Sequence, residues 1–146
     1  MNPATAIAFP APAAAAPVAG RATVLFAHGS RDAAWRAPIE AVAERMRTLA
    51  PGATVCCAYL EYTTPTLPDA VAALVSAGAR EVTVWPMFLG TGRHAREDLP
   101  LLMDELRAGH PAVDFALYPA IAEHPEVLQA MALAALGTAP DETPRA

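Results

Sequence analysis

The chain has 146 residues, 54% of them hydrophobic, and its formal net charge at pH 7 is −5. This length suits one domain with a full hydrophobic core, and a second domain would be cramped. All ten basic residues are arginines, which excludes a lysine nucleophile, and the acidic balance argues against nucleic acid as the main partner.

The two ends of the chain differ in composition from its middle. Residues 1–20, MNPATAIAFPAPAAAAPVAG, lack the positive segment of an export signal, and four prolines interrupt them. We therefore predict a disordered extension over residues 1–20, one α/β domain over residues 21–137 and a flexible tail over residues 138–146. No apolar run approaches the roughly 20 residues of a membrane-spanning helix, so we expect no membrane contact.

Four cycles of a strand followed by a helix fill the middle of the chain. The predicted strands cover residues 23–27, 54–60, 82–89 and 113–118. The predicted helices cover residues 33–49, 66–78, 97–108 and 125–136. In the first helix, the apolar residues at helical spacing are Ile39, Val42, Met46 and Leu49. Strict alternation of strands with helices implies right-handed crossovers and a parallel sheet.

The expected strand order is 2-1-3-4, the first part of a flavodoxin-like, three-layer sandwich with helices on both faces of the sheet. In this order the first and third strands are neighbours at the point where the order reverses, so the loops after them face each other. His28 follows the first strand, and His94 follows the third strand through a glycine loop. The topology alone should bring these two histidines together.

His28 and His94 could bind a metal ion, carry protons, or be polar loop residues. Imidazole is a common neutral ligand for divalent metals and also titrates near neutral pH. Glu61 ends the second strand at the same edge, so it is the best carboxylate to join the histidines as base or ligand, or else a solvated loop acid. Asp98 could orient the ring of His94, although a first-turn acid favoured by the helix dipole is the simpler interpretation.

Arg31, Arg93 and Arg96 flank the two histidine segments and would make this edge locally cationic. Guanidinium groups pair with carboxylates, so these arginines, with Ser30, are candidate binding residues for a polycarboxylate ligand; the alternative is ordinary surface arginines. Ser30 lies in a His-Gly-Ser-Arg sequence, which lacks the Gly-x-Ser-x-Gly elbow of many serine hydrolases. We expect Ser30 to cap the following helix.

The cysteines and the remaining histidines are predicted to be structural. Cys56 and Cys57 are adjacent in a strand, so their side chains should point to opposite faces of the sheet without a disulfide. Free cysteines are compatible with a cytoplasmic location. His110 and His124 precede prolines at a helix end and a helix start, although His124 could reach the site from a sheet-edge loop.

Four segments of the chain together have a recognisable pattern: FAHGSRDAAW, YLEYTTPTL, VTVWPMFLGTGRHAREDLP and PAIAEHPEV. In this order and spacing they closely resemble the small sirohydrochlorin chelatases, short members of the class II tetrapyrrole chelatases. The resemblance covers residues 22–136. It implies a lyase that inserts Co²⁺ or Fe²⁺, or in some relatives Ni²⁺, into sirohydrochlorin, a tetrapyrrole with eight carboxylates. The product would serve cobalamin or sirohaem synthesis, without an organic cofactor.

The resemblance also implies roles for individual residues. His28 and His94 match the metal-binding and catalytic histidines of the family, and Glu61 matches an acidic residue near the site. The small members are homodimers. Arg93 departs from the pattern, because many relatives have glycine before the histidine.

Two other classes of protein remain open from the residues themselves. A non-catalytic carrier of metal or tetrapyrrole would use the same histidines and release its cargo stoichiometrically. A small hydrolase or mutase on a flavodoxin-like sheet would use His28 as nucleophile or base, and would act without added metal.

Overall fold

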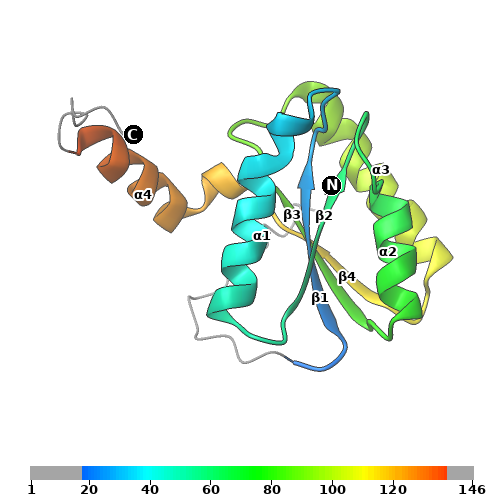
Figure 1. The fold of residues 1–146 in the computed structure, drawn as a ribbon. Helices are drawn as coiled ribbons and strands as arrows, with labels where there is room; N and C mark the ends of the chain where they lie inside the picture. The colour runs from blue at the N-terminus through cyan, green and yellow to red at the C-terminus, as the bar shows by residue number, and fades with distance from the viewer. Residues whose placement is uncertain (1–17, 138–146) are drawn as a thin grey trace.

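A four-stranded parallel sheet forms the centre of the computed structural model, which describes residues 18–137 (Figure 1). Its strands are β1 (Arg21–Ala27), β2 (Thr54–Tyr59), β3 (Glu81–Pro86) and β4 (Asp114–Leu117). They lie in the order β2-β1-β3-β4, and every neighbouring pair is parallel. The predicted strand order is confirmed, although β3 ends three residues earlier than expected.

The helices follow the strands as expected, with two differences at their starts. They are α1 (Ala37–Leu49), α2 (Leu67–Ser76), α3 (Arg93–Gly109) and α4 (Pro125–Leu136), with short 3-10 helices η1 (Ala33–Arg36) and η2 (Ile121–Glu123). The first predicted helix is divided into η1 and α1, and Pro38 lies in the first turn of α1, where its missing N–H costs no hydrogen bond. Helix α3 begins four residues earlier than predicted.

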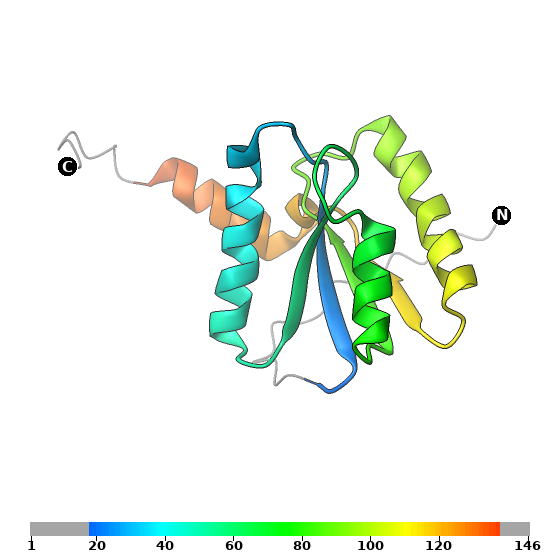
Figure 2. The ribbon, with the colours of Figure 1, turned by 45° about the vertical axis from the view of Figure 1, so that its right-hand side comes forward.

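Two hydrophobic clusters hold the helices to the two faces of the sheet (Figure 2). The larger cluster joins the sheet to α2 and α3, and its most deeply buried side chains are Val24, Phe26, Leu67, Val71, Val82, Val84 and Met103. The smaller cluster joins the sheet to α1 and consists of Leu25, Ala27, Ile39, Ala43, Val55 and Tyr59. The predicted three-layer arrangement is confirmed.

The buried face of α1 is narrower than its set of apolar residues. Ile39 and Ala43 are its buried residues, whereas Val42 and Leu49 are 39% and 78% exposed. Ile39 and Ala43 lie one turn apart on a single line of the helix, so α1 contacts the sheet along a narrow strip. The apolar spacing therefore predicted the helix correctly, and two of its four residues, Ile39 and Met46, contact the smaller cluster.

Cys56 and Cys57 point to opposite faces of β2, as predicted. Cys56 packs against the larger cluster and Cys57 against the smaller one, and both are free thiols. Burial raises the pKa of the Cys56 thiol to about 11 and also raises the pKa of Cys57. Both side chains are therefore neutral near pH 7, and both are partly buried at the edges of the clusters.

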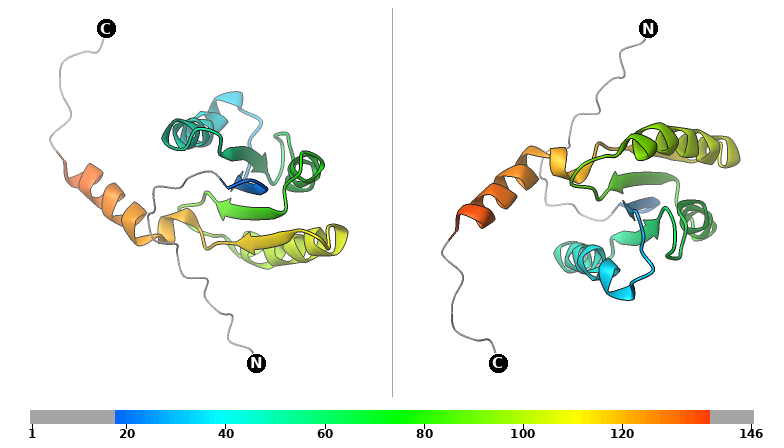
Figure 3. Two further views of the ribbon diagram at one scale, coloured as in Figure 1. Left: turned by 90° about the horizontal axis from the view of Figure 1, so that it is seen from below. Right: turned by 90° about the horizontal axis from the view of Figure 1, so that it is seen from above.

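Helix α4 does not extend the layer that α1 begins. None of its residues is buried, and Figures 1 and 3 show it pointing away from the sheet. The predicted extension and tail lie largely or wholly outside the described residues, at 1–17 and 138–146. The division of the chain into one domain and two terminal segments therefore stays a prediction.

Candidate functional site

His28 lies directly after β1, at the carboxyl edge of the sheet, and its side chain is exposed. The imidazole ring stacks on the ring of Phe88, with 4.3 Å between the ring centroids and 26° between the planes. Phe88 is buried and in turn meets Phe26 edge to face, with centroids 6.1 Å apart. The aromatic ring of Phe88 thus supports one face of His28 and leaves the other toward solvent.

Backbone hydrogen bonds place Glu61 beside His28. The amide of Leu60 donates to the carbonyl of Ala27 at 2.9 Å, and the amide of Glu61 donates to the carbonyl of His28 at 3.0 Å. The parallel pairing of β1 and β2 therefore continues past the ends of both strands. Because the backbones of His28 and Glu61 are held side by side, two of the three predicted catalytic residues are neighbours in space.

Gly29 permits the closest contact between these two loops. Its φ is +90°, a left-handed conformation that L side chains rarely adopt, and a Cβ added to it would lie 1.7 Å from the carbonyl oxygen of Glu61. A residue with a side chain at this position would have to push the loops apart. A glycine is therefore required here both because φ is positive and because the Glu61 carbonyl oxygen leaves no room for a Cβ.

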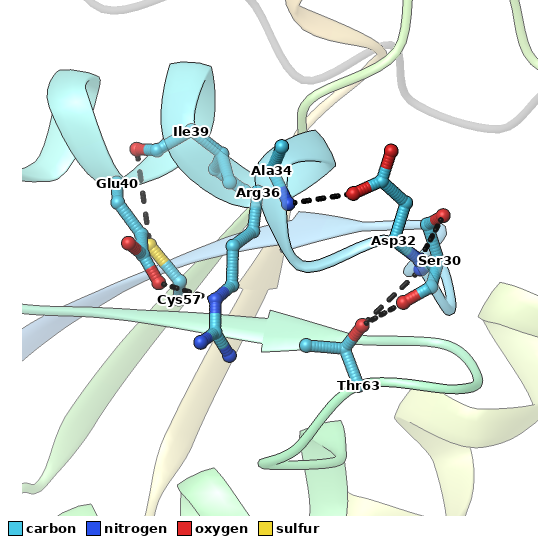
Figure 4. Close-up of polar contacts among 8 residues, drawn as sticks. All are labelled: Ser30, Asp32, Ala34, Arg36, Ile39, Glu40, Cys57 and Thr63. Carbon is cyan, nitrogen blue, oxygen red and sulfur yellow. Dashed lines mark hydrogen bonds and ion pairs between the residues drawn. The ribbon is translucent and has the colours of Figure 1, made fainter.

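A second set of contacts joins the same loops (Figure 4). The Thr63 hydroxyl accepts a hydrogen bond from the Ser30 amide at 3.1 Å and donates one to the Ser30 carbonyl at 3.0 Å. The guanidinium of Arg31 lies over the ring of Tyr62, 4.8 Å from its centroid. These contacts hold the His28 loop on the Glu61 loop without using the side chains of His28 or Glu61.

Ser30 does not cap the following helix, so that prediction was wrong. Its hydroxyl accepts from the Asp32 amide at 3.1 Å, and the cap is Asp32, whose carboxylate accepts from the Ala34 amide at 2.9 Å (Figure 4). A carboxylate is a stronger acceptor for a helix amide than a hydroxyl, and Asp32 stands immediately before η1. Whether Ser30 also contacts a ligand stays a prediction.

His94 lies in the first turn of α3 and not in the preceding loop, and its side chain is exposed. The next residue, Ala95, lines a pocket of about 290 Å³ together with Phe26 from β1 and Leu60 from the end of β2. The start of α3 and the ends of β1 and β2 therefore border one pocket. Neither histidine lines this pocket, so the convergence of the side chains of His28 and His94 stays a prediction.

Asp98 lies in the second turn of α3, because the helix begins at Arg93, and it lines the same pocket. The simpler interpretation, a first-turn acid at the helix N-terminus, is therefore wrong. The carboxylate instead adds a negative group to a pocket that is otherwise mainly apolar.

The three candidate arginines are spread along the sheet edge. Arg31 lies over Tyr62, beside the Glu61 loop. Arg93 is 81% exposed and forms an ion pair with Glu97, 3.0 Å between Nε and Oε1. Arg96 lines a different pocket of about 380 Å³, beyond the ends of β3 and β4. The structure therefore places Arg31 close to the His28 loop, and Arg96 in a neighbouring pocket.

The other two histidines have the structural positions that were expected. His124 caps α4, its Nδ1 accepting from the Glu126 amide at 3.2 Å, and His110 ends α3 with its amide bonded to the Leu106 carbonyl. Phe88, which supports His28, was not predicted as a site residue. The sequence could have indicated Phe88 only through the run of apolar residues that continues past the end of β3.

Within residues 18–137, no group of three or more His, Cys, Asp or Glu side chains is arranged to hold a metal ion. No helix in the same range is long and apolar enough to cross a membrane.

Comparison with known families decides the assignment, because residues 22–135 match the CbiX family. The chain belongs to the CbiX family. It is 33% identical over 82 residues to the sirohydrochlorin cobaltochelatases of Methanococcus maripaludis and of Methanopyrus kandleri. Each match covers 56% of this chain and 57% of the relative, so it spans little more than half the length of these curated relatives.

Solved structures of CbiX-type proteins have the same fold. A cobalamin (vitamin B12) biosynthesis CbiX protein from Marinobacter aquaeolei VT8 has a TM-score of 0.69 and 33% identity, covering 80% of this chain and 94% of that one. The sirohydrochlorin chelatase SirB of Bacillus subtilis subspecies spizizenii, in complex with cobalt, has a TM-score of 0.65 and 25% identity, covering 75% and 47%. SirB from Bacillus subtilis with Fe³⁺ has a TM-score of 0.66 and 25% identity, and the match covers 82% of this chain and 48% of that one. The resemblance inferred from the sequence motifs is confirmed.

Proposed function

We propose that this CbiX chain is a sirohydrochlorin chelatase, a lyase that inserts a divalent metal ion into sirohydrochlorin. The observation that carries the proposal is the pairing of His28 with Glu61 across the ends of β1 and β2, next to the pocket at the start of α3. The relatives named above are sirohydrochlorin cobaltochelatases, and the SirB structures contain cobalt or Fe³⁺. We therefore propose Co²⁺ or Fe²⁺ as the metal substrate, with Ni²⁺ as a further candidate.

His28 and His94 are the proposed metal ligands. Two neutral imidazoles can hold a divalent ion and leave positions open for the pyrrole nitrogens that replace them. A site closed by four protein ligands would retain the metal, whereas a metal that is a substrate must leave. The lack of a three-residue ligand group among residues 18–137 suits this second behaviour.

Metal insertion also requires a base. Two pyrrole N–H bonds break as the M²⁺ ion enters, so two protons leave the macrocycle and the total charge is conserved. Glu61 or one of the histidines can accept these protons. The side chains of Glu61 and His28 are both exposed, so each can pass the proton on to water.

The arginines are the proposed anchors for the carboxylates of the substrate. Arg31 and Ser30 lie on the His28 loop, while Arg93 and Arg96 lie on the first turn of α3, so a macrocycle over the edge could meet both groups. Guanidinium–carboxylate pairing is geometrically specific and suits a polyanionic ligand. No organic cofactor is required. We further propose a cytoplasmic homodimer, with no nucleic-acid or membrane partner, that acts in cobalamin or sirohaem synthesis.

The test is an absorbance assay of the purified protein with sirohydrochlorin and Co²⁺, Fe²⁺ or Ni²⁺, compared with the uncatalysed insertion rate. The variants are His28→Ala, His94→Ala and Glu61→Gln, and the matched control is His110→Ala at the opposite end of α3. We expect many turnovers per chain for the wild type and for the control, with insertion abolished by either histidine change at the site.

Glu61→Gln keeps the size of the side chain and removes the base. A loss of turnover with metal binding retained would assign the proton transfer to Glu61. Stoichiometric metal release without turnover would favour the carrier, and full activity of His94→Ala would exclude the proposed metal site.

A further inference from the structure

His28 lacks the hydrogen bond that normally orients a metal-binding histidine. Such a histidine usually donates the N–H of its second ring nitrogen to a carboxylate or a carbonyl, which fixes the direction of the ring. Among residues 18–137, no group forms a hydrogen bond with either ring nitrogen of His28. Its ring contact is the stack on Phe88, with 4.3 Å between the centroids and 26° between the planes. An aromatic ring therefore takes the place of the usual acceptor.

Phe88 is a fixed support, although it lies in the loop after β3. Its side chain is buried in the larger cluster and meets the ring of Phe26 edge to face. Backbone hydrogen bonds hold it on both sides: the Met87 amide donates to the Phe26 carbonyl at 2.7 Å, and the Phe88 carbonyl accepts from the Ala122 amide at 3.3 Å. A side chain packed in this way has little freedom to move, so it can hold the exposed ring of His28 in place.

The stack limits the positions at which His28 can hold a metal ion. The lone pair of an imidazole nitrogen lies in the plane of the ring, so a bound ion lies near that plane. The stack keeps the His28 ring within 26° of the plane of the Phe88 ring, although the histidine side chain is exposed. A ligand that is oriented before the ion arrives loses less conformational freedom on binding, which raises its affinity.

His94 has no comparable support. Its side chain is exposed in the first turn of α3, and within the described part of the chain it forms neither a ring contact nor a side-chain hydrogen bond. The two proposed metal ligands therefore differ in the structure without metal. The ring of His28 is oriented in advance, whereas the ring of His94 has to be ordered when the metal binds.

We propose that Phe88 is a positioning residue for the metal substrate, and that its flat ring sets the affinity of the site for the ion by orienting His28. Phe88 has no group that can bind a metal or accept a proton, so it acts only through the histidine. It should therefore affect metal binding and leave the proton transfer from the macrocycle unchanged. This inference rests on the chelatase function proposed above and adds to it the residue that prepares one of the two ligands.

The test measures the dissociation constant for Co²⁺ by isothermal titration calorimetry, on protein without a histidine tag and without sirohydrochlorin. Phe88→Leu removes the flat ring and should raise the dissociation constant by about 10–100-fold, the usual effect of losing a group that orients a metal ligand. Phe88→Tyr keeps the ring and should bind Co²⁺ within about 3-fold of the wild type. Circular dichroism verifies folding, and Phe88→Met, which fills more of the space without a flat ring, replaces Phe88→Leu if that variant is unfolded.

Phe115→Leu is the matched control. Phe115 packs against the same larger cluster, and its ring also lies beside a histidine, with its centroid 6.3 Å from that of His110. This pair is at the opposite end of α3 from His94. We expect Phe115→Leu to bind Co²⁺ with the affinity of the wild type, because the lost ring supports no metal ligand.

A double-mutant cycle separates positioning from a general loosening of the site. In the His28→Ala background, Phe88→Leu should change the remaining Co²⁺ affinity by less than about 2-fold, because the residue through which it acts is absent. A general loosening would weaken the binding by His94 as well, in both backgrounds. In turnover with sirohydrochlorin, Phe88→Leu should raise the KM for Co²⁺ and keep kcat within about 2-fold of the wild type.

The outcomes distinguish this inference from the function on which it rests. Wild-type Co²⁺ affinity in Phe88→Leu, equal losses in Phe88→Leu and Phe88→Tyr, or the same loss in the His28→Ala background would each overturn the positioning role while the chelatase proposal stands. If His28→Ala itself bound Co²⁺ and turned over like the wild type, the proposed metal site and this inference would both be wrong.

Discussion

Gly29→Ala is the most direct test of how the two loops of the site meet. The alanine would have to adopt φ +90°, which costs about 1–2 kcal/mol for an L residue. Its Cβ would also begin 1.7 Å from the Glu61 carbonyl oxygen and would need at least 3.0 Å, so the loops must separate by about 1.3 Å. Forcing packed groups apart costs about 1–3 kcal/mol more, which gives a total of about 2–5 kcal/mol.

Gly78→Ala is the matched control. Gly78 has φ +105°, but no atom lies within 4 Å of an added Cβ, so only the conformational cost of about 1–2 kcal/mol applies. Gly90→Ala has open space and no positive φ, and should change stability by less than about 0.5 kcal/mol. Urea unfolding gives the three free energies directly.

The same variants separate stability from activity. A displacement of about 1 Å in a catalytic group can reduce the rate by about 100-fold, so Gly29→Ala should lose chelatase kcat/KM at temperatures where it is fully folded. Gly78→Ala, which lies at the opposite end of the sheet after α2, should keep normal kcat/KM. If Gly29→Ala were as stable and as active as Gly78→Ala, the close approach of the two loops would be wrong.

Two further predictions concern the loops and the core. Thr63→Val removes the hydroxyl that bonds both backbone groups of Ser30, and it should reduce the free energy of unfolding in urea by about 1–3 kcal/mol. The control, Thr48→Val, loses one exposed hydrogen bond to the Glu44 carbonyl and should reduce the same free energy by less than about 0.5 kcal/mol. Equal losses in the two variants would contradict the contact between the loops. Burial raises the pKa of Cys56 from 9.0 to about 11 and that of Tyr59 from 10.0 to about 12. The folded state therefore holds these protons more tightly than the unfolded state, so stability is complete below pH 9 and falls as the pH rises toward 12. When alkaline unfolding is followed by circular dichroism, the helical signal of Cys56→Ala should fall less than that of the wild type at the start of the pH rise. The same pH profile for both proteins would contradict the raised pKa of the Cys56 thiol.

Much of the site followed from the sequence because topology placed it. Once four strand–helix cycles predicted the order 2-1-3-4, His28 and the segment leading to His94 had to lie at neighbouring positions on one edge of the sheet. Glu61 followed by the same reasoning from the end of the second strand. The start of α3 was misjudged because Gly90 and Gly92 suggested a longer loop. The helix in fact begins directly after Gly92, and His94 enters its first turn.

The features that were missed depend on packing, which local patterns do not contain. Phe88 was predicted as part of a strand, but in the structure it lies beyond the strand and forms the surface on which His28 rests. The bounds of α4 were predicted correctly, but its sequence did not show that none of its residues would be buried. Hydrophobic periodicity predicts that a segment is helical, but it does not show what its apolar side chains will pack against.

The opposed side chains of Cys56 and Cys57 provide two natural reporters of local unfolding. Both thiols are partly buried, and each packs against one cluster, Cys56 against the α2–α3 layer and Cys57 against the α1 layer. In single-cysteine variants, the increase of each labelling rate with added urea, above the rate in the native state, would follow the opening of each layer separately. Two consecutive residues of one strand can thus show whether the two halves of the core open together or one at a time.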